Sequence, residues 1–228
     1  MKYTLTFIAI LISQLCIAQQ ITYKEWKEQA KTEIRLLPEY GNVIKTKGQI
    51  AADQELIQTE VQQEGTYRKA SDHLITLGFN NLYVGDVKTA MYRFNQAWLL
   101  DPKNANVYWG YGAIYLSFND TDEALRQYDK GLAIDPKSAN ILTDKATAYM
   151  SIFANMGRPD YLNKAIELFN KSYNIDPSNQ NTSFKLSAAY FYKKDCVNAR
   201  KFYNACMKLG GQPITQEYTD ALNKMCAK

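Results

Sequence analysis

Residues 71–136, SDHLITLGFNNLYVGDVKTAMYRFNQAWLLDPKNANVYWGYGAIYLSFNDTDEALRQYDKGLAIDP, decide the fold because their two halves carry the same pattern. Each patterned residue of the first half has its counterpart 34 positions later, usually with a similar character. The matched pairs are Leu74 and Tyr108, Leu77 and Tyr111, Gly78 and Gly112, Asn81 and Tyr115, Ala90 and Ala124, Phe94 and Tyr128, Ala97 and Gly131, and Pro102 and Pro136. A fixed period of this length indicates a stack of repeated structural units.

The residue types in the pattern have physical reasons, which the first half illustrates. Gly78 lets two helices of one unit approach closely, and Ala90 is the small residue that faces it from the second helix. Phe94 is large enough to fill the space between neighbouring units. Asp101-Pro102 ends the second helix, because the residue before a proline avoids helical backbone angles. Each half therefore predicts two helices joined by a short turn.

This pattern resembles the tetratricopeptide repeat, a helix–turn–helix unit that must stack because one unit buries only part of its apolar face. The resemblance covers residues 71 to about 211 and implies an all-α fold, a right-handed helical-hairpin solenoid of about four repeats. The repeats are expected at 71–104, 105–138, 139–179 and 180–213, with an N-terminal helical capping segment at 19–70 and a C-terminal capping helix at 214–228. Repeat three carries seven extra residues, which predict one more turn in each helix and a loop near 155–160.

The N-terminal capping segment is predicted to hold two helices without the repeat pattern. The first spans Thr22 to Leu37 and places Trp26, Ile34 and Leu37 on one face; the second spans Gln49 to Glu64. Two arrangements follow from this pattern. The helices could cover the apolar end of the solenoid, or the helix with Trp26 could lie in the groove of the solenoid itself.

Residues 1–18 are typical of a secretory signal peptide. Lys2 is followed by the short apolar run at 7–12, and Cys16 and Ala18 are small residues suited to cleavage before Gln19. We therefore expect an exported protein, in the periplasm or cell envelope, with secretion as one alternative. An outer-membrane lipoprotein lipidated on Cys16 is another, although the bulky Leu15 directly before this cysteine departs from the usual lipidation pattern.

The composition argues against catalysis, metal binding and nucleic-acid binding. The net charge of +4 is too small to indicate a nucleic-acid partner, and no later stretch is apolar enough to predict a membrane span in the mature chain. His73 is the only histidine, so no catalytic set, cofactor site or transition-metal site is predicted. We expect a non-enzymatic protein.

The resemblance implies that the first helices line a concave groove that binds a protein or peptide. The groove residues carried over are Ile75, Phe79 and Tyr83 in repeat one, Asn106 and Trp109 in repeat two, Asn140 and Asp144 in repeat three, and Asn181, Phe184, Lys185, Phe191 and Tyr192 in repeat four. The predicted function is an exported adaptor. The alternative is a structural or assembly component of a cell-envelope complex whose groove is occupied by its own N-terminal helices.

Three cysteines follow the signal peptide, and two of them are predicted to form a disulfide. Cys196 and Cys206 lie largely on one helix, about 15 Å apart, which is too far for a bond. Cys196 begins the second helix of repeat four and Cys226 ends the last helix, each 15 residues from Gly211. Antiparallel packing of these helices would bring the two ends together. The alternative is two unpaired or intermolecular thiols.

Overall fold

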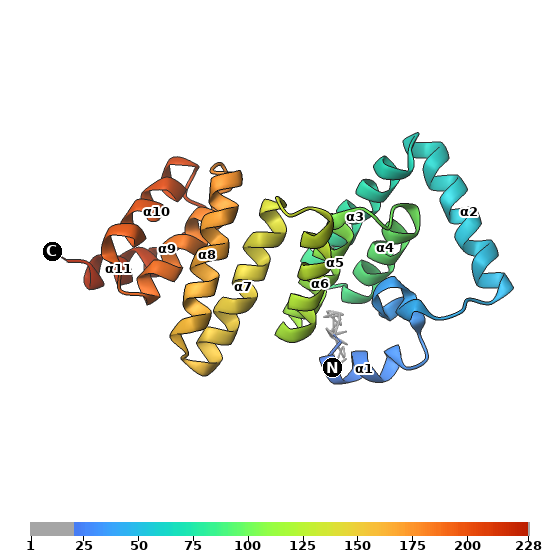
Figure 1. Ribbon diagram of the computed structural model, residues 1–228, viewed down its shortest axis with the longest axis horizontal. Helices are drawn as coiled ribbons and strands as arrows, with labels where there is room; N and C mark the ends of the chain where they lie inside the picture. Colours follow the sequence, from blue (N-terminus) through green and yellow to red (C-terminus); the bar gives the residue numbers. More distant parts are fainter. Residues whose placement is uncertain (1–20, 228) are drawn as a thin grey trace, which may run out of the picture.

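The computed structural model describes residues 21–227, and its regular elements are all helices (Figure 1). The expected signal peptide, with Cys16 and Gln19, lies outside the described residues. Four helical hairpins follow one another along the long axis of the molecule: α3 (Tyr67–Tyr83) with α4 (Val87–Leu100), α5 (Ala105–Ser117) with α6 (Thr121–Ile134), α7 (Ala139–Met156) with α8 (Pro159–Ile175), and α9 (Gln180–Tyr192) with α10 (Cys196–Lys208). The fold is the expected helical solenoid. No helix between residues 21 and 227 is long and apolar enough to cross a membrane.

Side-chain caps begin the repeated helices. Asn104, Ser138 and Asn179 accept a backbone N–H at the start of α5, α7 and α9, and aspartates do the same at the start of α4, α6 and α10. A cap of this kind typically stabilises a helix by about 1 kcal/mol. The helix boundaries therefore follow from the sequence as well as from packing.

The core of repeats one and two is built where an aromatic ring meets a glycine. A Cβ added at Gly78 or at Gly110 would overlap the same edge of the Phe94 ring, and one added at Gly112 would overlap Tyr128. Phe94 and Tyr128 have no exposed surface. Gly78 on α3 and Gly110 on α5 are thus required because both helices closely approach the Phe94 ring of α4. Gly112 is required in the same way by the ring of Tyr128.

The core of repeats three and four replaces part of this packing with buried hydroxyl groups. Thr143 Oγ1 lies 2.8 Å from Ser172 Oγ and 2.7 Å from Thr182 Oγ1, so α7, α8 and α9 meet at one hydrogen-bonded cluster. The extra residues of repeat three lengthen both helices: α7 has 18 residues and α8 has 17, against 13 and 14 in α5 and α6. The turn between them is made by Gly157, whose φ of 68° favours glycine.

The predicted N-terminal helix at 22–37 is wrong in its second half. Helix α1 (Tyr23–Ala30) begins with a capping box formed by Thr22 and Glu25, but it ends at Ala30. A short 3-10 turn, η1 (Ile34–Leu36), follows, and a second one, η2 (Pro38–Asn42), contains left-handed residues. The apolar spacing had suggested one helix, whereas the chain turns so that Leu36, rather than Ile34 or Leu37, is buried.

The left-handed turn is the most unusual backbone of the protein. Glu39, Tyr40 and Asn42 have φ values of 56°, 54° and 54°, and Gly41 between them has 66°. Residues other than glycine that adopt this conformation cost about 1 kcal/mol or more each, and they persist only where the surroundings hold them. The turn is therefore held in this conformation by the parts of the solenoid that pack around it.

Helix α2 (Lys47–Glu64) stands apart from the rest, and no side chain on it is fully buried (Figure 1). It contacts α3 and α4, at the end of the solenoid where repeat one has no preceding repeat. Thr66 then caps α3, because its side chain accepts the backbone N–H of Lys69. Helix α2 thus partly covers the solenoid end, which agrees with one of the two expected arrangements.

Helix α11 (Gln216–Met225) lies at the C-terminal end and packs on α9 and α10 (Figure 1). The structure joins Cys196 and Cys226 in a disulfide, with their Cα atoms 5.6 Å apart, and leaves Cys206 as a buried thiol. Ser187, which stands where the repeat usually has a smaller residue, donates or accepts a 2.6 Å hydrogen bond with Tyr218 of α11. The cap therefore docks on repeat four at the position where that repeat departs from the pattern.

Candidate functional site

The first helices of the four hairpins, α3, α5, α7 and α9, contact one another in sequence and form one continuous face. We call it the first-helix face. The repeat pattern predicts that the concave groove lies on this face.

Four predicted groove residues form an unbroken row across the first-helix face, one from each repeat. The ring centroids of Phe79 and Trp109 are 4.1 Å apart, and the Trp109 indole Nε1–H donates a 2.7 Å hydrogen bond to Asp144 Oδ2. Lys185 Nζ lies 3.4 Å from Asp144 Oδ1 and donates a 2.8 Å hydrogen bond to Thr147 Oγ1. The groove row, Phe79–Trp109–Asp144–Lys185, therefore joins all four repeats by direct contacts.

The groove row offers both apolar and charged surface to a partner. Phe79 and Trp109 are half-buried, and the side chains of Asp144 and Lys185 are each 23% exposed. Tyr128 lies under this face, where burial first and the Asp144 carboxylate second raise the pKa of its phenol well above the usual range. Its hydroxyl is buried and has no hydrogen-bond partner in the described part of the chain. Such a row can bind an aromatic or apolar side chain and orient polar groups.

The other predicted groove residues fall into three groups. Asn106 is half-buried, Asn140 and Asn181 are exposed, and Tyr83 and Tyr192 are 93% and 58% exposed at the ends of α3 and α9. Phe184 and Phe191 are half-buried because Tyr218 of α11 packs against both, at centroid distances of 5.4 Å and 5.8 Å. Ile75 is 5% exposed and belongs to the core, so its assignment to the groove is wrong. The helical register placed it beside the face, but packing between α3 and its neighbours encloses it.

The N-terminal segment does not lie over the groove row. Trp26 is 1% exposed and packs against Phe118 at the end of α5, with ring centroids 5.2 Å apart. The turns η1 and η2 contact α4, a second helix. The alternative in which the helix with Trp26 lies in the groove is therefore wrong, because the buried ring of Trp26 packs at the other side of the hairpins.

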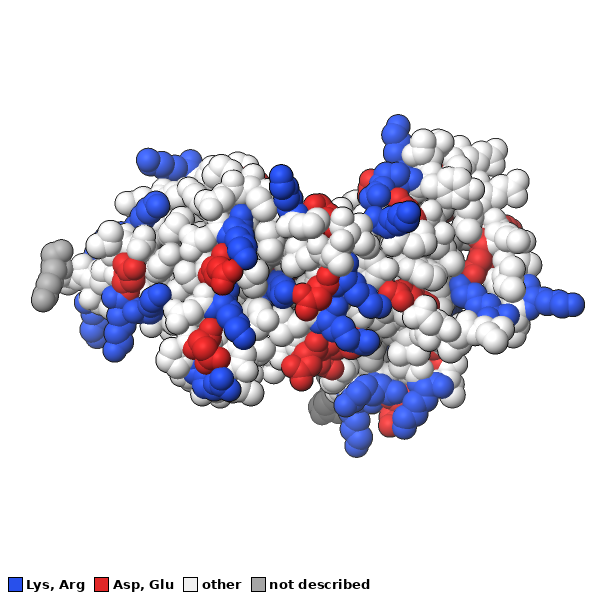
Figure 2. Space-filling view, viewed as in Figure 1, with Lys and Arg blue, Asp and Glu red and all other residues white. Residues whose placement is uncertain are grey.

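Charges on the visible face of the molecule are mixed rather than concentrated. Figure 2 shows lysine and arginine side chains interspersed with carboxylates along the hairpins. Within residues 21–227, no three His, Cys, Asp or Glu side chains come together as a possible metal site.

Sequence reasoning missed the residues that attach the N-terminal segment to the repeats. Asn95 on α4 is fully buried, and its side chain contacts the N-terminal segment and Tyr111. A single asparagine among apolar residues was the only signal, and it did not indicate which segment would pack there.

The middle of the chain also matches a known family. The family model for the tetratricopeptide repeat matches residues 82–151, which span the end of α3 to the second half of α7. The chain therefore contains tetratricopeptide repeats. No curated protein sequence matches it significantly.

Several solved structures are similar to this tetratricopeptide repeat protein. A thermophilic repeat protein of Thermus thermophilus is 16% identical and has a TM-score of 0.58, covering 68% of this chain and 80% of its own. Yeast Tom70 is 18% identical with a TM-score of 0.54, covering 90% of this chain and 42% of its own. The first repeat domain of Spaghetti (RPAP3), solved with an HSP90 peptide, is 25% identical with a TM-score of 0.48, covering 56% of this chain and 94% of its own. At these identities the first two matches show the shared fold alone.

Proposed function

We propose that this tetratricopeptide repeat protein is an exported, non-catalytic adaptor that binds a protein or peptide on its first-helix face. The observation that carries the proposal is the groove row, in which one residue from each repeat contacts the next. Repeat solenoids use such extended surfaces for binding, and half-exposed aromatic side chains commonly dominate the binding energy of an interface.

Export is supported by two features that arise from different parts of the chain. The N-terminal sequence is typical of a signal peptide, and the structure pairs Cys196 with Cys226. Disulfides persist in oxidising compartments and are rare where thiols are kept reduced. We propose the periplasm or cell envelope as the location.

The alternative role, a structural component whose groove is filled by its own N-terminal helices, has no such support. The described N-terminal segment packs at the second helices, which leaves the groove row available to a separate partner.

The test compares two tryptophan variants. Protein beginning at Gln19 is immobilised and used to capture partners from an extract of the cell envelope of its source. Trp109→Ala should weaken capture by about 2 kcal/mol, or roughly 30-fold in affinity, as expected for an aromatic anchor. The control is Trp98→Ala, which removes a tryptophan from α4, outside the first-helix face. This variant should retain the partner.

Circular dichroism must show that both variants keep their helices. An unchanged affinity of a folded Trp109→Ala variant would contradict the proposal, because the partner would then bind elsewhere.

A further inference from the structure

The positive charge of this protein is concentrated near its C-terminal end. Residues 193–208, which form the turn before α10 and α10 itself, hold five lysine and arginine residues and one aspartate, a net charge of +4. Of the 27 basic residues only Lys2 precedes Gln19, and no acidic residue does, so the chain from Gln19 has 26 basic and 23 acidic residues and a net charge of +3. The remainder of that chain therefore sums to −1, and the small overall charge hides a local excess.

Four lysines of this segment project into solvent. Lys193 and Lys194 lie in the turn, and Lys201 and Lys208 lie on α10; all four are exposed. Lys201 and Lys208 are seven residues apart, or about two helical turns, so they share one side of the helix with Val197. We call these four lysines and Val197 the α10 basic face.

The lysines of the α10 basic face have no carboxylate partner. None of the four forms an ion pair with a residue between 21 and 227. The one carboxylate of the segment, Asp195, caps the start of α10 and accepts a 2.7 Å hydrogen bond from the Asn198 amide. In Figure 2 lysine and arginine side chains prevail over carboxylates at the end of the molecule formed by α10 and α11. The excess charge of the segment is thus left for a partner to neutralise.

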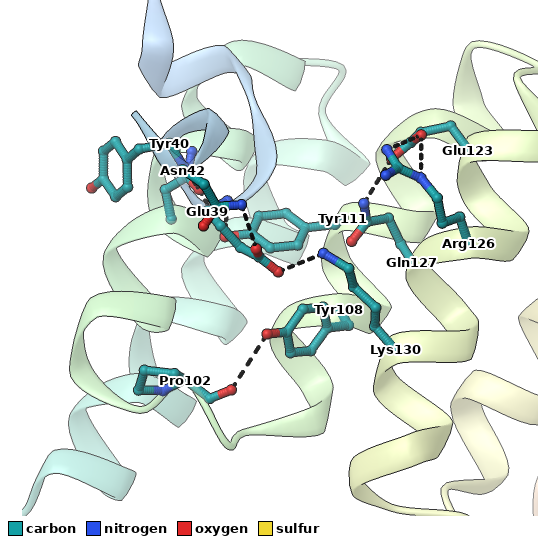
Figure 3. Close-up of polar contacts among 11 residues, drawn as sticks. Glu39, Tyr40, Asn42, Pro102, Tyr108, Tyr111, Glu123, Arg126, Gln127 and Lys130 are labelled. Carbon is teal, nitrogen blue, oxygen red and sulfur yellow. Dashed lines mark hydrogen bonds and ion pairs between the residues drawn. The ribbon is translucent and has the colours of Figure 1, made fainter. Parts of the chain in front are cut away.

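The cleft between the N-terminal segment and α6 shows the opposite arrangement. There Lys130 Nζ lies 2.8 Å from Glu39 Oε1, and Arg126 pairs with Glu123, as Figure 3 shows. Each basic side chain of these two pairs therefore has its counter-charge inside the protein. Charge alone does not distinguish the two regions, because both contain lysine and arginine; the absence of paired carboxylates distinguishes the α10 basic face.

Apolar side chains project beside the lysines. Val197 is 81% exposed, and Met207, which precedes Lys208, is 48% exposed. A side chain as exposed as Val197 stands out from the surface and does not line a cleft in which a peptide could be enclosed. Exposed apolar groups among basic ones are typical of helices that lie on a membrane, where the apolar side chains enter the boundary between headgroups and acyl chains.

The type of cation also indicates the type of partner. Arginine binds carboxylates in a fixed, bidentate geometry, whereas lysine is a point charge on a flexible stem. The only arginine of the segment, Arg200, already donates to Asn223 Oδ1 at 3.2 Å and to the carbonyl of Cys226 at 3.0 Å. The charges that remain free are all lysines. Such a face suits a broad anionic surface without fixed geometry, as anionic phospholipid headgroups provide, better than a folded acidic protein.

We propose that the α10 basic face docks this protein on the surface of a bilayer that contains anionic phospholipid. The four lysines face the headgroups, and Val197 enters the boundary below them. Helix α10 is a second helix, whereas the groove row lies on the first helices. The membrane contact therefore leaves the groove row free, and it adds a location to the proposed adaptor without using the same residues.

The test is flotation of the protein beginning at Gln19 with vesicles of phosphatidylglycerol and phosphatidylcholine in equal amounts. We expect the protein to float with these vesicles at about 0.05 M salt and to be released at about 0.5 M, because salt screens interactions between exposed charges. Vesicles of phosphatidylcholine alone should not bind it. Trp109→Ala should bind the anionic vesicles as the unaltered chain does, so this proposal and the groove proposal fail separately.

Matched variants locate the contact. Lys194→Gln, Lys201→Gln and Lys208→Gln together should weaken vesicle binding about 100-fold, because each lysine near an anionic surface contributes about fivefold. The control replaces three other exposed lysines without ion pairs, and it should change binding by less than about threefold. Its substitutions are Lys47→Gln, Lys103→Gln and Lys137→Gln. Val197→Ser should weaken binding by about threefold, and this loss should not depend on salt.

Four results would overturn the proposal. The first is a lack of binding to anionic vesicles at low salt, and the second is equal binding to neutral ones. The third is an equal loss in both triple variants, which would show that net charge acts without a defined face. The fourth is tighter binding to soluble poly-glutamate than to the vesicles, which would indicate an acidic protein as the partner of the α10 basic face.

Discussion

The two terminal segments of this protein are attached to the same solenoid by different physical means. The N-terminal segment buries Trp26, Leu36 and Tyr40 and forms hydrogen bonds to a buried asparagine. Helix α11 has ten residues and fully buries only Leu222, but it is joined to α10 by the bond between Cys226 and Cys196. A segment that crosses two repeats can be held by burial and hydrogen bonds, whereas a short helix at the open end of a stack gains from a covalent bond.

The largest expected effect is on the N-terminal segment. Trp26→Ala should destabilise its attachment by about 3–5 kcal/mol, because a large, fully buried side chain is lost and leaves a cavity. Hydrogen exchange should accelerate at the backbone amides of Glu39 and Tyr40, while α11 keeps its protection. Lys24→Ala on the same helix should change little. Slow exchange at Tyr40 in Trp26→Ala would show that Trp26 does not hold the segment.

The C-terminal segment should respond to reduction instead. The Cys196–Cys226 bond closes a loop with a sequence separation of 30, for which the chain-entropy model gives about 3–4 kcal/mol of stabilisation. Dithiothreitol should therefore accelerate exchange in α11 and leave the amides of Glu39 and Tyr40 protected. A variant with Cys196→Ser and Cys226→Ser should exchange rapidly at α11 without reductant and show no further response to it.

Protein recovered from the envelope provides an independent test of the bond. Alkylation without reduction should leave Cys196 and Cys226 unlabelled. Labelling of both residues would contradict the disulfide in the exported protein.

The smallest expected effect is on the pH dependence of stability. It distinguishes the two terminal segments, because it acts through a carboxylate of the N-terminal segment. Burial alone would raise the pKa of Glu39, but hydrogen bonds from Lys130 and Asn42 outweigh it, and the pKa lies below its ordinary value. A lowered folded-state pKa means that the stabilisation is complete above the ordinary pKa of a glutamate and is lost as the pH falls through the folded-state value. Glu39→Gln should lower the free energy of unfolding by about 1 kcal/mol at pH 6 and leave it unchanged in strong acid.

The measurement is the difference in unfolding free energy between the native chain and Glu39→Gln from pH 6 to pH 3. A difference that does not change over this range would show that the ion pair with Lys130 contributes nothing.

The sequence predicted the repeated hairpins well, because local patterns determine them. The caps at Asn104 and Ser138 and the turn at Gly157 depend on neighbouring residues in the chain, so the boundaries of α5 and α7 could be read directly. The same approach failed at residues 31–42. Apolar spacing there matched a helix, but it contains no information about Tyr111 and Asn95, which hold the left-handed turn from other parts of the chain.

The candidate groove was predicted in part for a related reason. The repeat register placed Phe79, Trp109, Asp144 and Lys185 on one face, and the structure brings all four into contact. Register does not determine how much of each side chain is left exposed. Ile75 is enclosed by helix packing, and Phe184 and Phe191 are partly covered by Tyr218 from α11. The cleft between the N-terminal segment and α6 was not predicted, because the N-terminal segment lies outside the repeats and the repeat pattern does not say where it packs.

The packing of one ring against two glycines also limits which substitutions this protein can accept during evolution. Gly78 and Gly110 belong to different repeats, yet a side chain at either position would collide with Phe94. A larger residue at one glycine would therefore be tolerated only after Phe94 became smaller, and a smaller residue at 94 would leave a cavity beside both glycines at once. The two repeats consequently share one evolutionary constraint, so they cannot diverge independently at this contact even though each is a separate unit of the stack.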